Sequence, residues 1–590
     1  MPIDEAIEYM KSAIKKSYMN KGEDVVNMNC NAVDAGVTHV HKVKVPERWK
    51  TITVSTNKEQ LQSDRPDLKK YLNDILTTDA AMKGDEIPTS KFLDVADGMI
   101  PAGTAAYEKR GIAIDVPLWI SENCIQCNLC AYSCPHGVIR AFALSEADAE
   151  AAQATTLKSK ANPDHKFMIS ISTVNCTGCG SCVQVCPAKE KALKMIPYED
   201  ERSAEQQRVF DYANDHTDEN VLDGNVDTPR NVSFIKPLLE FSGACPGCGE
   251  TPYARLVTQL FGDRMFIANA TGCSSIWGGS APSTPYTINR EGRGPAWSNS
   301  LFEDNAEFGL GMAVSMNTRR KEMKSAVKRL AEKSEFCDVA TEWLDGMEDS
   351  RKAESAARKL IEVCKDSDDA DANFVAKNAD LLPKPSIWIF GGDGWAYDIG
   401  YGGLDHVIAS GENVNILVFD TEVYSNTGGQ ASKSTPAGAI AQFAAAGKAV
   451  GKKNLAEIAM AYGYVYVAQV AMGANPTQTL TALKEAEAYD GPSIVIAYSP
   501  CINHGIRAGM NCSMNEMKKA VQSGYWNLFR FDPRKAIEGD GNPFTLDSKK
   551  PTLEYKEFLD GEVRYRALEQ SNPERAKKLF DEAAKQAEAR

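Results

Sequence analysis

Short apolar runs rich in β-branched residues recur in the second half of the chain and alternate with helix-like segments. The clearest runs are residues 386–390, 414–419, 464–468 and 493–497. Continuous apolar runs of this length are typical of strands buried on both faces, and helical segments between them favour a parallel sheet with crossover helices. The pattern predicts an α/β domain over residues 231–540.

The rest of the chain has a different pattern. Apolar residues from Ile3 to Ile14 recur with a helical period and predict a helix over residues 2–20 with one buried stripe, for which no preceding segment supplies a partner. We expect a Pro/Gly-punctuated linker or ancillary domain at 51–112, an Ala/Glu-rich helical insertion near 145–160, a charged helical excursion with a solvated face at 319–380, and a C-terminal tail at 541–590.

Composition limits the class of protein. The 590 residues are 43% hydrophobic and 25% charged, which is typical of a soluble globular chain of several domains. A net charge of −14 argues against a nucleic-acid partner. No apolar stretch approaches the length of a membrane span, and the N-terminus lacks the apolar core of a signal peptide, so we expect no membrane association and a cytoplasmic location.

Cysteine spacing supplies the first chemistry. The 16 cysteines are too sparse for a disulfide scaffold, which favours a reducing compartment. Eight of them form two copies of C-x2-C-x2-C-x3-C-P, namely Cys124, Cys127, Cys130 and Cys134, then Cys176, Cys179, Cys182 and Cys186. This spacing is typical of two [4Fe-4S] clusters, and the alternative is zinc. It predicts a ferredoxin-like electron-transfer domain over residues 113–230.

The same spacing predicts how the ligands are shared. In two-cluster ferredoxins the fourth cysteine of each motif binds the other cluster. One cluster would therefore take Cys124, Cys127, Cys130 and Cys186, and the other Cys176, Cys179, Cys182 and Cys134.

A third group of cysteines is less regular. Cys245 and Cys248 form one C-x2-C pair, and Cys273 and Cys501 lie in Gly- or Pro-bounded turns beside predicted strands. From these residues alone a third cluster, a structural zinc site and a redox dithiol all remain open.

A Gly-Asp-Gly triplet follows the strand that ends at residue 390. Asp393 and oxygen ligands about 28 residues later, at the end of a neighbouring strand, can form half of an octahedral Mg²⁺ site completed by diphosphate oxygens. Gly392 and Gly394 would let the backbone approach the phosphates, although such triplets are also common in turns. The spacing resembles the thiamine diphosphate motif, with Thr421 in place of the ligand Asn and the backbone carbonyl of Val423 as a further ligand.

Together these motifs resemble the pyruvate:ferredoxin oxidoreductase (pyruvate synthase) family. The resemblance is strongest in CIQCNLCAYSCPHGVIR, ACPGCGETPY, GGDGWAYDIGYGGLDHV and FDTEVYSNTGGQASKSTPAGA, and it covers nearly the whole chain. It implies a ferredoxin-like two-[4Fe-4S] domain followed by a thiamine-diphosphate-binding parallel-sheet domain. It also implies that Cys245, Cys248, Cys273 and Cys501 bind a third [4Fe-4S] cluster, nearest the thiamine.

The resemblance assigns further residues. Asp393, Thr421 and Val423 would hold Mg²⁺, Asn426 would reach the bound pyruvate as the catalytic residue, and Asn29 would contact coenzyme A. The implied cofactor-binding set is Asn29, Glu250, Cys273, Gly392, Asp393, Gly394, Trp395, Thr421, Glu422, Val423, Tyr424, Ser425 and Asn426. His504 is expected to be a hydrogen-bonding neighbour of the third cluster, because cubane clusters of this type prefer thiolates.

The implied reaction is oxidative decarboxylation of pyruvate with coenzyme A to acetyl-CoA and CO₂, with ferredoxin or flavodoxin as electron acceptor. The family's pyrimidine-binding domain has no counterpart here, and residues 1–50 resemble the C-terminal remnant of a preceding 2-oxoacid oxidoreductase gamma-type domain. We therefore expect the C-terminal half of the enzyme, which needs an N-terminal partner or assembles as a homo-oligomer. The alternatives are another 2-oxoacid as substrate, or an electron-carrier subunit with a non-functional thiamine site.

Overall fold

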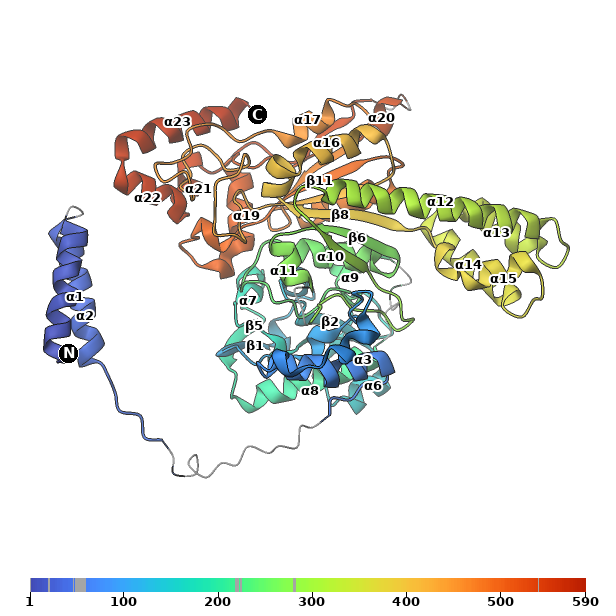
Figure 1. Cartoon of the computed structure of the whole chain (residues 1–590), viewed down its shortest axis with the longest axis horizontal. Coiled ribbons are helices and arrows are strands. Elements are labelled where there is room, and N and C mark those ends of the chain that lie inside the picture. Colours follow the sequence, from blue (N-terminus) through green and yellow to red (C-terminus); the bar gives the residue numbers. More distant parts are fainter. Residues whose placement is uncertain are drawn as a thin grey trace. The chain divides into compact units, whose positions relative to one another are not determined.

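The computed structural model describes residues 2–19, 22–45, 47, 60–217, 222, 225–279, 283–537, 539 and 541–589 (Figure 1). The first part of the expected linker, residues 51–59, lies outside the described residues. The chain divides into two units, Met1–Gln60 and Leu61–Arg590.

The first unit is a pair of helices, α1 (Ile3–Tyr18) and α2 (Glu23–Thr38). An ion pair of 2.6 Å between Lys11 Nζ and Asp34 Oδ1 joins them. The helix predicted at the N-terminus is present, but none of its described residues is buried, so the expected burial of its apolar stripe is not seen in this unit.

The second unit begins with short helices around a small apolar cluster. They are α3 (Pro66–Tyr71), the π-helix η3 (Leu72–Leu76), α4 (Thr77–Ala80), and the 3₁₀ turns η4 (Gly84–Glu86), η5 (Thr89–Val95) and η6 (Thr104–Tyr107). Leu68, Tyr71, Leu72, Ile75 and Leu76 form the cluster, so this stretch has its own core.

The cysteine-rich region contains two small sheets. β1 (Asp115–Trp119) pairs antiparallel with β5 (Leu193–Pro197), and β4 (Lys166–Ile171) lies between β2 (Ile139–Leu144) and β3 (Leu157–Lys158). The helical pieces are η7 (Ser121–Asn123), α5 (Leu129–Tyr132), α6 (Glu146–Ala151), η8 (Thr173–Asn175), α7 (Ser181–Val185), α8 (Glu201–His216) and α9 (Pro229–Val232). The two cysteine loops have similar backbone conformations. Asn128 before α5 and Gly180 before α7 both adopt the left-handed conformation.

An eight-stranded sheet forms the large domain, in the order β13-β12-β10-β11-β9-β8-β6-β7. The six strands from β10 to β7 are parallel, and β12 and β13 add antiparallel at one edge. The predicted parallel α/β domain is thus confirmed. The strands are β6 (Met265–Ala270), β7 (Ala296–Ser300), β8 (Ser386–Gly392), β9 (Asn415–Asp420), β10 (Tyr466–Val470), β11 (Ser493–Tyr498), β12 (Phe529–Phe531) and β13 (Phe544–Leu546).

Helices and short turns connect these strands. They are α10 (Thr251–Phe261), η9 (Gly262–Arg264), α11 (Cys273–Gly279), η10 (Ala379–Leu381), the π-helix η11 (Gly394–Ile399), α16 (Tyr401–Ser410), α17 (Leu455–Met460), α18 (Pro476–Ala488), η12 (Ile502–His504), η13 (Met510–Cys512), α19 (Ser513–Gln522) and α20 (Arg534–Ile537). The chain ends in α21 (Tyr555–Leu559), α22 (Val563–Ser571) and α23 (Pro573–Ala589), which bury Phe558, Leu568 and Phe580.

A helical arm extends from the sheet between β7 and β8 (Figure 1). It comprises α12 (Asn305–Ala331), α13 (Cys337–Gly346), α14 (Ser350–Cys364) and α15 (Ala370–Lys377). The expected helices are present, but the segment is more than a solvated face, because Leu330, Trp343 and Leu360 are fully buried. Most of the charges lie on the outer faces of the arm, and its buried apolar residues are continuous with the core of the large domain.

No helix among the described residues is both long and apolar enough to cross a membrane.

Replacing the central tryptophan of the arm should loosen it. Trp343 is fully buried, and its indole N–H donates to the carbonyl of Leu382 over 3.1 Å. We expect Trp343→Ala to lower the free energy of local opening of α13, measured by hydrogen exchange, by about 3–5 kcal/mol. The control Asp345→Ala, at an exposed position on the same helix, should change it by less than about 0.5 kcal/mol. Equal effects of the two variants would contradict a packed arm.

Candidate active site

The carboxyl ends of four adjacent parallel strands hold the predicted site residues. In sheet order these strands are β11, β9, β8 and β6. Cys501 follows β11, Thr421 follows β9, Asp393 follows β8 and Cys273 follows β6. Parallel strands bind ligands at this edge of a sheet. Residues more than two hundred positions apart are therefore brought to one edge.

The three predicted magnesium ligands meet there. The Thr421 hydroxyl oxygen lies 2.9 Å from Asp393 Oδ1 and 3.0 Å from the carbonyl oxygen of Val423. The Thr421 amide also donates to Asp393 Oδ1 over 3.1 Å. Carboxylate, hydroxyl and carbonyl oxygens are the ligands that Mg²⁺ prefers. The donor set therefore fits a magnesium ion.

Two buried carboxylates flank this turn, and only one is paired with a cation. The Asp420 carboxylate accepts from Tyr397 over 2.7 Å and from Ser434 over 2.5 Å, and Lys452 lies 2.8 Å away. Asp393 is completely buried and accepts from the Ser432 hydroxyl over 2.6 Å. Burial and the nearby charge of Asp420 hold the pKa of Asp393 well above its usual range.

A pocket beside the turn collects most of the predicted cofactor-binding residues. Its lining includes Glu250, Cys273, Gly392, Gly394, Trp395, Val423, Tyr424, Ser425 and Asn426, together with Thr271, Phe302 and Thr427. A Cβ atom on Gly394 would lie 2.6 Å from the Tyr424 ring, whereas one on Gly392 would meet no atom closer than 3.9 Å. Gly394 thus makes room for the tyrosine, and Gly392 leaves open space for a ligand.

Glu250 is the buried acid of this pocket. Its carboxylate accepts from the Trp277 indole N–H over 2.7 Å, and burial raises the pKa of Glu250 to about 7. Cys273 lies opposite, with its sulfur 3.1 Å from the Ser425 hydroxyl. The pocket therefore offers an acid, a thiol and a hydroxyl to a bound molecule.

The third group of cysteines gathers at the same edge. Burial, Glu250, Cys248 and Cys501 all raise the pKa of Cys273, and burial, Glu250 and Cys245 contribute to raising that of Cys501 to about 12. The amide of Gly249 donates to the carbonyl of Pro500 over 3.1 Å, which ties the Cys245–Cys248 loop to the end of β11. These four thiols fit the predicted cluster site.

The fourth cysteine of each regular motif lies near the first three cysteines of the other. Cys124, Cys127, Cys130 and Cys186 line one cavity. In the other group, burial raises the pKa of Cys182. The neighbouring thiols of Cys179, Cys134 and Cys176 raise this pKa further. No three His, Cys, Asp or Glu side chains in the described part of the chain converge where a single ion would bind. Thiols spread around a cavity instead suit a four-iron cubane.

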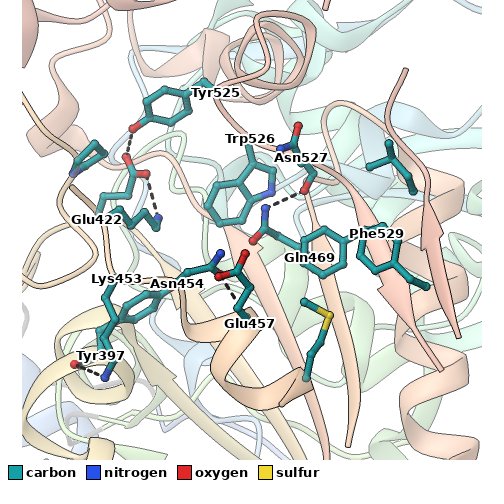
Figure 2. Close-up of a pocket in the computed structure, with 15 residues that line it drawn as sticks. Tyr397, Glu422, Lys453, Asn454, Glu457, Gln469, Tyr525, Trp526, Asn527 and Phe529 are labelled. Atoms are coloured by element: carbon teal, nitrogen blue, oxygen red, sulfur yellow. Dashed lines mark hydrogen bonds and ion pairs between the residues drawn. The ribbon is translucent and has the colours of Figure 1, made fainter. Parts of the chain in front are cut away.

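Glu422, another predicted cofactor residue, is not part of the pocket beside the turn. The Glu422 side chain faces a second pocket, between Lys452 and Tyr525 (Figure 2). Asn29 belongs to the first unit, where its amide donates to the carbonyl of Val25 over 2.7 Å.

Sequence reasoning missed several residues around the turn. Ser432, Tyr397 and Lys452 contact its two aspartates. Tyr397 and Ser432 lie inside the motifs quoted above without having been assigned a role, and Lys452 lies outside them. His504 Nε2 lies 2.7 Å from the carbonyl oxygen of Thr421, so its hydrogen bond is to the metal-binding turn, and its expected role beside the third cluster stays a prediction.

Known families match three parts of the chain. Residues 123–190 match a 4Fe-4S dicluster domain, and residues 374–497 match the C-terminal TPP binding domain of thiamine pyrophosphate enzymes. Residues 55–113 match EKR, a domain of unknown function. The predicted fold class, a ferredoxin-like two-cluster domain followed by a thiamine diphosphate domain, is confirmed.

Fold and site together define an iron–sulfur chain with a thiamine pyrophosphate domain. The chain is 50% identical to pyruvate:ferredoxin oxidoreductase of Moorella thermoacetica, over 100% of its own length and 51% of that protein. It is 50% identical to pyruvate-flavodoxin oxidoreductase of Klebsiella pneumoniae, over 99% and 50% respectively. It is thus a relative of the pyruvate:ferredoxin and pyruvate-flavodoxin oxidoreductases along its whole length, as its motifs predicted, and spans about half of theirs.

Paired cysteine variants test the exchange of ligands. Cys124→Ala with Cys186→Ala should remove one cluster, so that iron falls by about four per chain, as in either single variant. Cys124→Ala with Cys134→Ala should remove both clusters and about eight irons per chain. Iron analysis and electron paramagnetic resonance of the reduced protein measure this. If Cys124→Ala with Cys186→Ala instead lost about eight irons, and Cys124→Ala with Cys134→Ala about four, each motif would bind its own cluster.

Proposed function

We propose that this chain is the thiamine and iron–sulfur part of a 2-oxoacid oxidoreductase that converts pyruvate and coenzyme A to acetyl-CoA and CO₂. Electrons would pass through three [4Fe-4S] clusters to ferredoxin or flavodoxin. The observation that supports this best is the meeting of the third cysteine group and the Asp393–Thr421 turn at one edge of the sheet. Electron source and first electron acceptor would then be neighbours.

Each group of residues would have a distinct task. Asp393, Thr421 and Val423 would hold Mg²⁺ and through it the diphosphate of the cofactor. Thiamine diphosphate, when bound, supplies the electron sink that stabilises a carbanion after decarboxylation. Glu250 and Cys273 line the pocket and would contact the cofactor, and Asn426 would orient pyruvate. The cysteine thiolates of the three groups would hold the clusters that conduct electrons away.

The chain would act with a second component. Because it spans about half the length of its relatives, we propose that an N-terminal half, supplied by a partner chain, completes the enzyme. Chain copies could also assemble as homo-oligomers.

Reconstitution tests this proposal. With its partner, the chain should reduce viologen in a pyruvate- and coenzyme-A-dependent reaction, and the purified chain should contain about 12 irons, three cubanes of four. A faster rate with another 2-oxoacid would show that this compound, and not pyruvate, is the substrate. An iron content of about eight per chain would show that the third cluster is absent. Absence of thiamine diphosphate binding in calorimetry would favour the alternative of an electron-carrier subunit.

A matched pair of variants tests the magnesium turn. Thr421→Val removes the hydroxyl at constant volume, and Thr421→Ser keeps it. In calorimetry with Mg²⁺ we expect Thr421→Val to bind thiamine diphosphate at least tenfold more weakly, about 1.4 kcal/mol, and Thr421→Ser to stay within a few-fold of the unaltered chain. Equal affinities for the Val and Ser variants would exclude the hydroxyl as a ligand.

A further inference from the structure

Glu422 lies between two of the proposed magnesium ligands, Thr421 and Val423, yet its side chain points away from them. Its backbone is left-handed, with φ of 61°. This conformation is unfavourable for a residue with a Cβ atom, and it persists only where the surroundings hold it. The contacts of the Glu422 side chain therefore bear on the shape of the turn.

Three groups hold the Glu422 carboxylate, and Figure 2 shows one of them, Tyr525, beside it. Lys452 Nζ lies 3.0 Å from Oε1, and Arg564 donates to Oε2 over 2.8 Å. The Tyr525 hydroxyl also donates to Oε2, over 2.5 Å. The Glu422 side chain is fully buried, and a cation lies within 3.0 Å of each of its two carboxylate oxygens.

The same network reaches the turn from its other side. The Arg564 Nε donates to Glu562 over 2.7 Å, and Glu562 lies 3.5 Å from His504 Nδ1. His504 Nε2 is 2.7 Å from the carbonyl of Thr421. The Glu422 side chain is thus bonded directly to Arg564, and the Thr421 carbonyl approaches the same network through His504, whose 3.5 Å contact with Glu562 is not a hydrogen bond.

Arg564 comes from the C-terminal helix α22, about 140 residues after the turn. Its carbonyl accepts from the amide of Ile440 over 2.9 Å, and the amide of Val563 donates to Gly505 over 2.9 Å. Backbone hydrogen bonds therefore place the guanidinium independently of the ion pair. Helix α22 and the network can act as one rigid support.

We propose that Glu422 and Arg564 are positioning residues that fix the metal-binding turn, so that the C-terminal helices are part of the cofactor site. The inference rests on the proposed function, in which this turn holds Mg²⁺ and the diphosphate. With Glu422 in its left-handed backbone, the Thr421 hydroxyl lies within 3.0 Å of both Asp393 Oδ1 and the Val423 carbonyl oxygen, so the Glu422 backbone sets the spacing of the three ligands. Removal of Arg564 leaves the buried Glu422 carboxylate with Lys452 as its cation, and neutralisation of Glu422 leaves the buried guanidinium with Glu562 alone, so each change removes one ion pair from the interior.

Hydrogen exchange without cofactor tests the support itself. We expect the amides of residues 421–424 to exchange at least tenfold faster in Glu422→Gln and in Arg564→Met, and Arg564→Lys to recover much of the protection. The control Arg320→Met removes an equally buried guanidinium, which bonds the carbonyls of Met347 and Leu381 in the helical arm. It should leave the turn unchanged. Rates within twofold of the unaltered chain in both network variants, or equal acceleration in the control, would overturn the proposal.

Calorimetry then links the support to the cofactor. Glu422→Gln and Arg564→Met should bind thiamine diphosphate with Mg²⁺ at least tenfold more weakly while their iron content stays that of the unaltered chain. Arg320→Met should bind as the unaltered chain does. Unchanged affinity in the network variants would overturn the role in the cofactor site. Lack of binding by the unaltered chain would instead refute the thiamine assignment, and hydrogen exchange would still decide whether the network shapes the turn.

Discussion

The parallel alignment of β11, β9, β8 and β6 is the constraint on which the site depends. Their registers place Tyr498 opposite Asp420 and Gly392 opposite Phe419, so the carboxyl ends of neighbouring strands lie level. Each strand end is followed by one predicted ligand. A one-residue slip of any strand would turn its apolar side chains and its ligand to the wrong face. The buried cores of these strands therefore determine the chemistry at their ends.

This arrangement buries charged side chains, which is energetically unfavourable unless each charge is paired. Asp393, Asp420 and Glu422 are all fully buried, and they lie close to one another in space. Asp420 and Glu422 are compensated by Lys452, and Glu422 also by Arg564. Asp393 has hydroxyl and amide donors but no cationic side chain in contact among the described residues. A bound Mg²⁺ would supply the missing positive charge, which explains why the carboxylate is retained in the interior.

Local sequence signals predicted the parts of the molecule that local rules control. Apolar runs located β8, β9 and β11 to within a residue or two, and cysteine spacing predicted that Cys186 groups with Cys124, Cys127 and Cys130. Both features depend on patterns that repeat within a few residues, namely apolar runs in the strands and the spacing of cysteines inside each motif. The charged composition of the arm concealed its buried positions, because apolar residues such as Trp343 and Leu360 are widely spaced on helices with polar outer faces.

Local sequence signals could not predict contacts between residues that are far apart in the chain. Arg564 and Lys452 look like ordinary surface cations in the sequence, and only the fold brings them to Glu422. The motif likewise suggested that the Glu422 side chain faces the cofactor pocket, whereas its left-handed backbone turns it to the opposite side. The conformation of a single residue in a turn depends on contacts more than a hundred residues away.

A third iron–sulfur cluster beside the thiamine turn, at one edge of the sheet, is the feature on which the proposed electron path depends. Anomalous diffraction at the iron edge, from crystals of the anaerobically purified chain with Mg²⁺ and thiamine diphosphate, would locate it. We expect three iron sites, the third bounded by Cys245, Cys248, Cys273 and Cys501 beside the cofactor. Two iron sites only, or a zinc signal at the third position, would contradict this expectation.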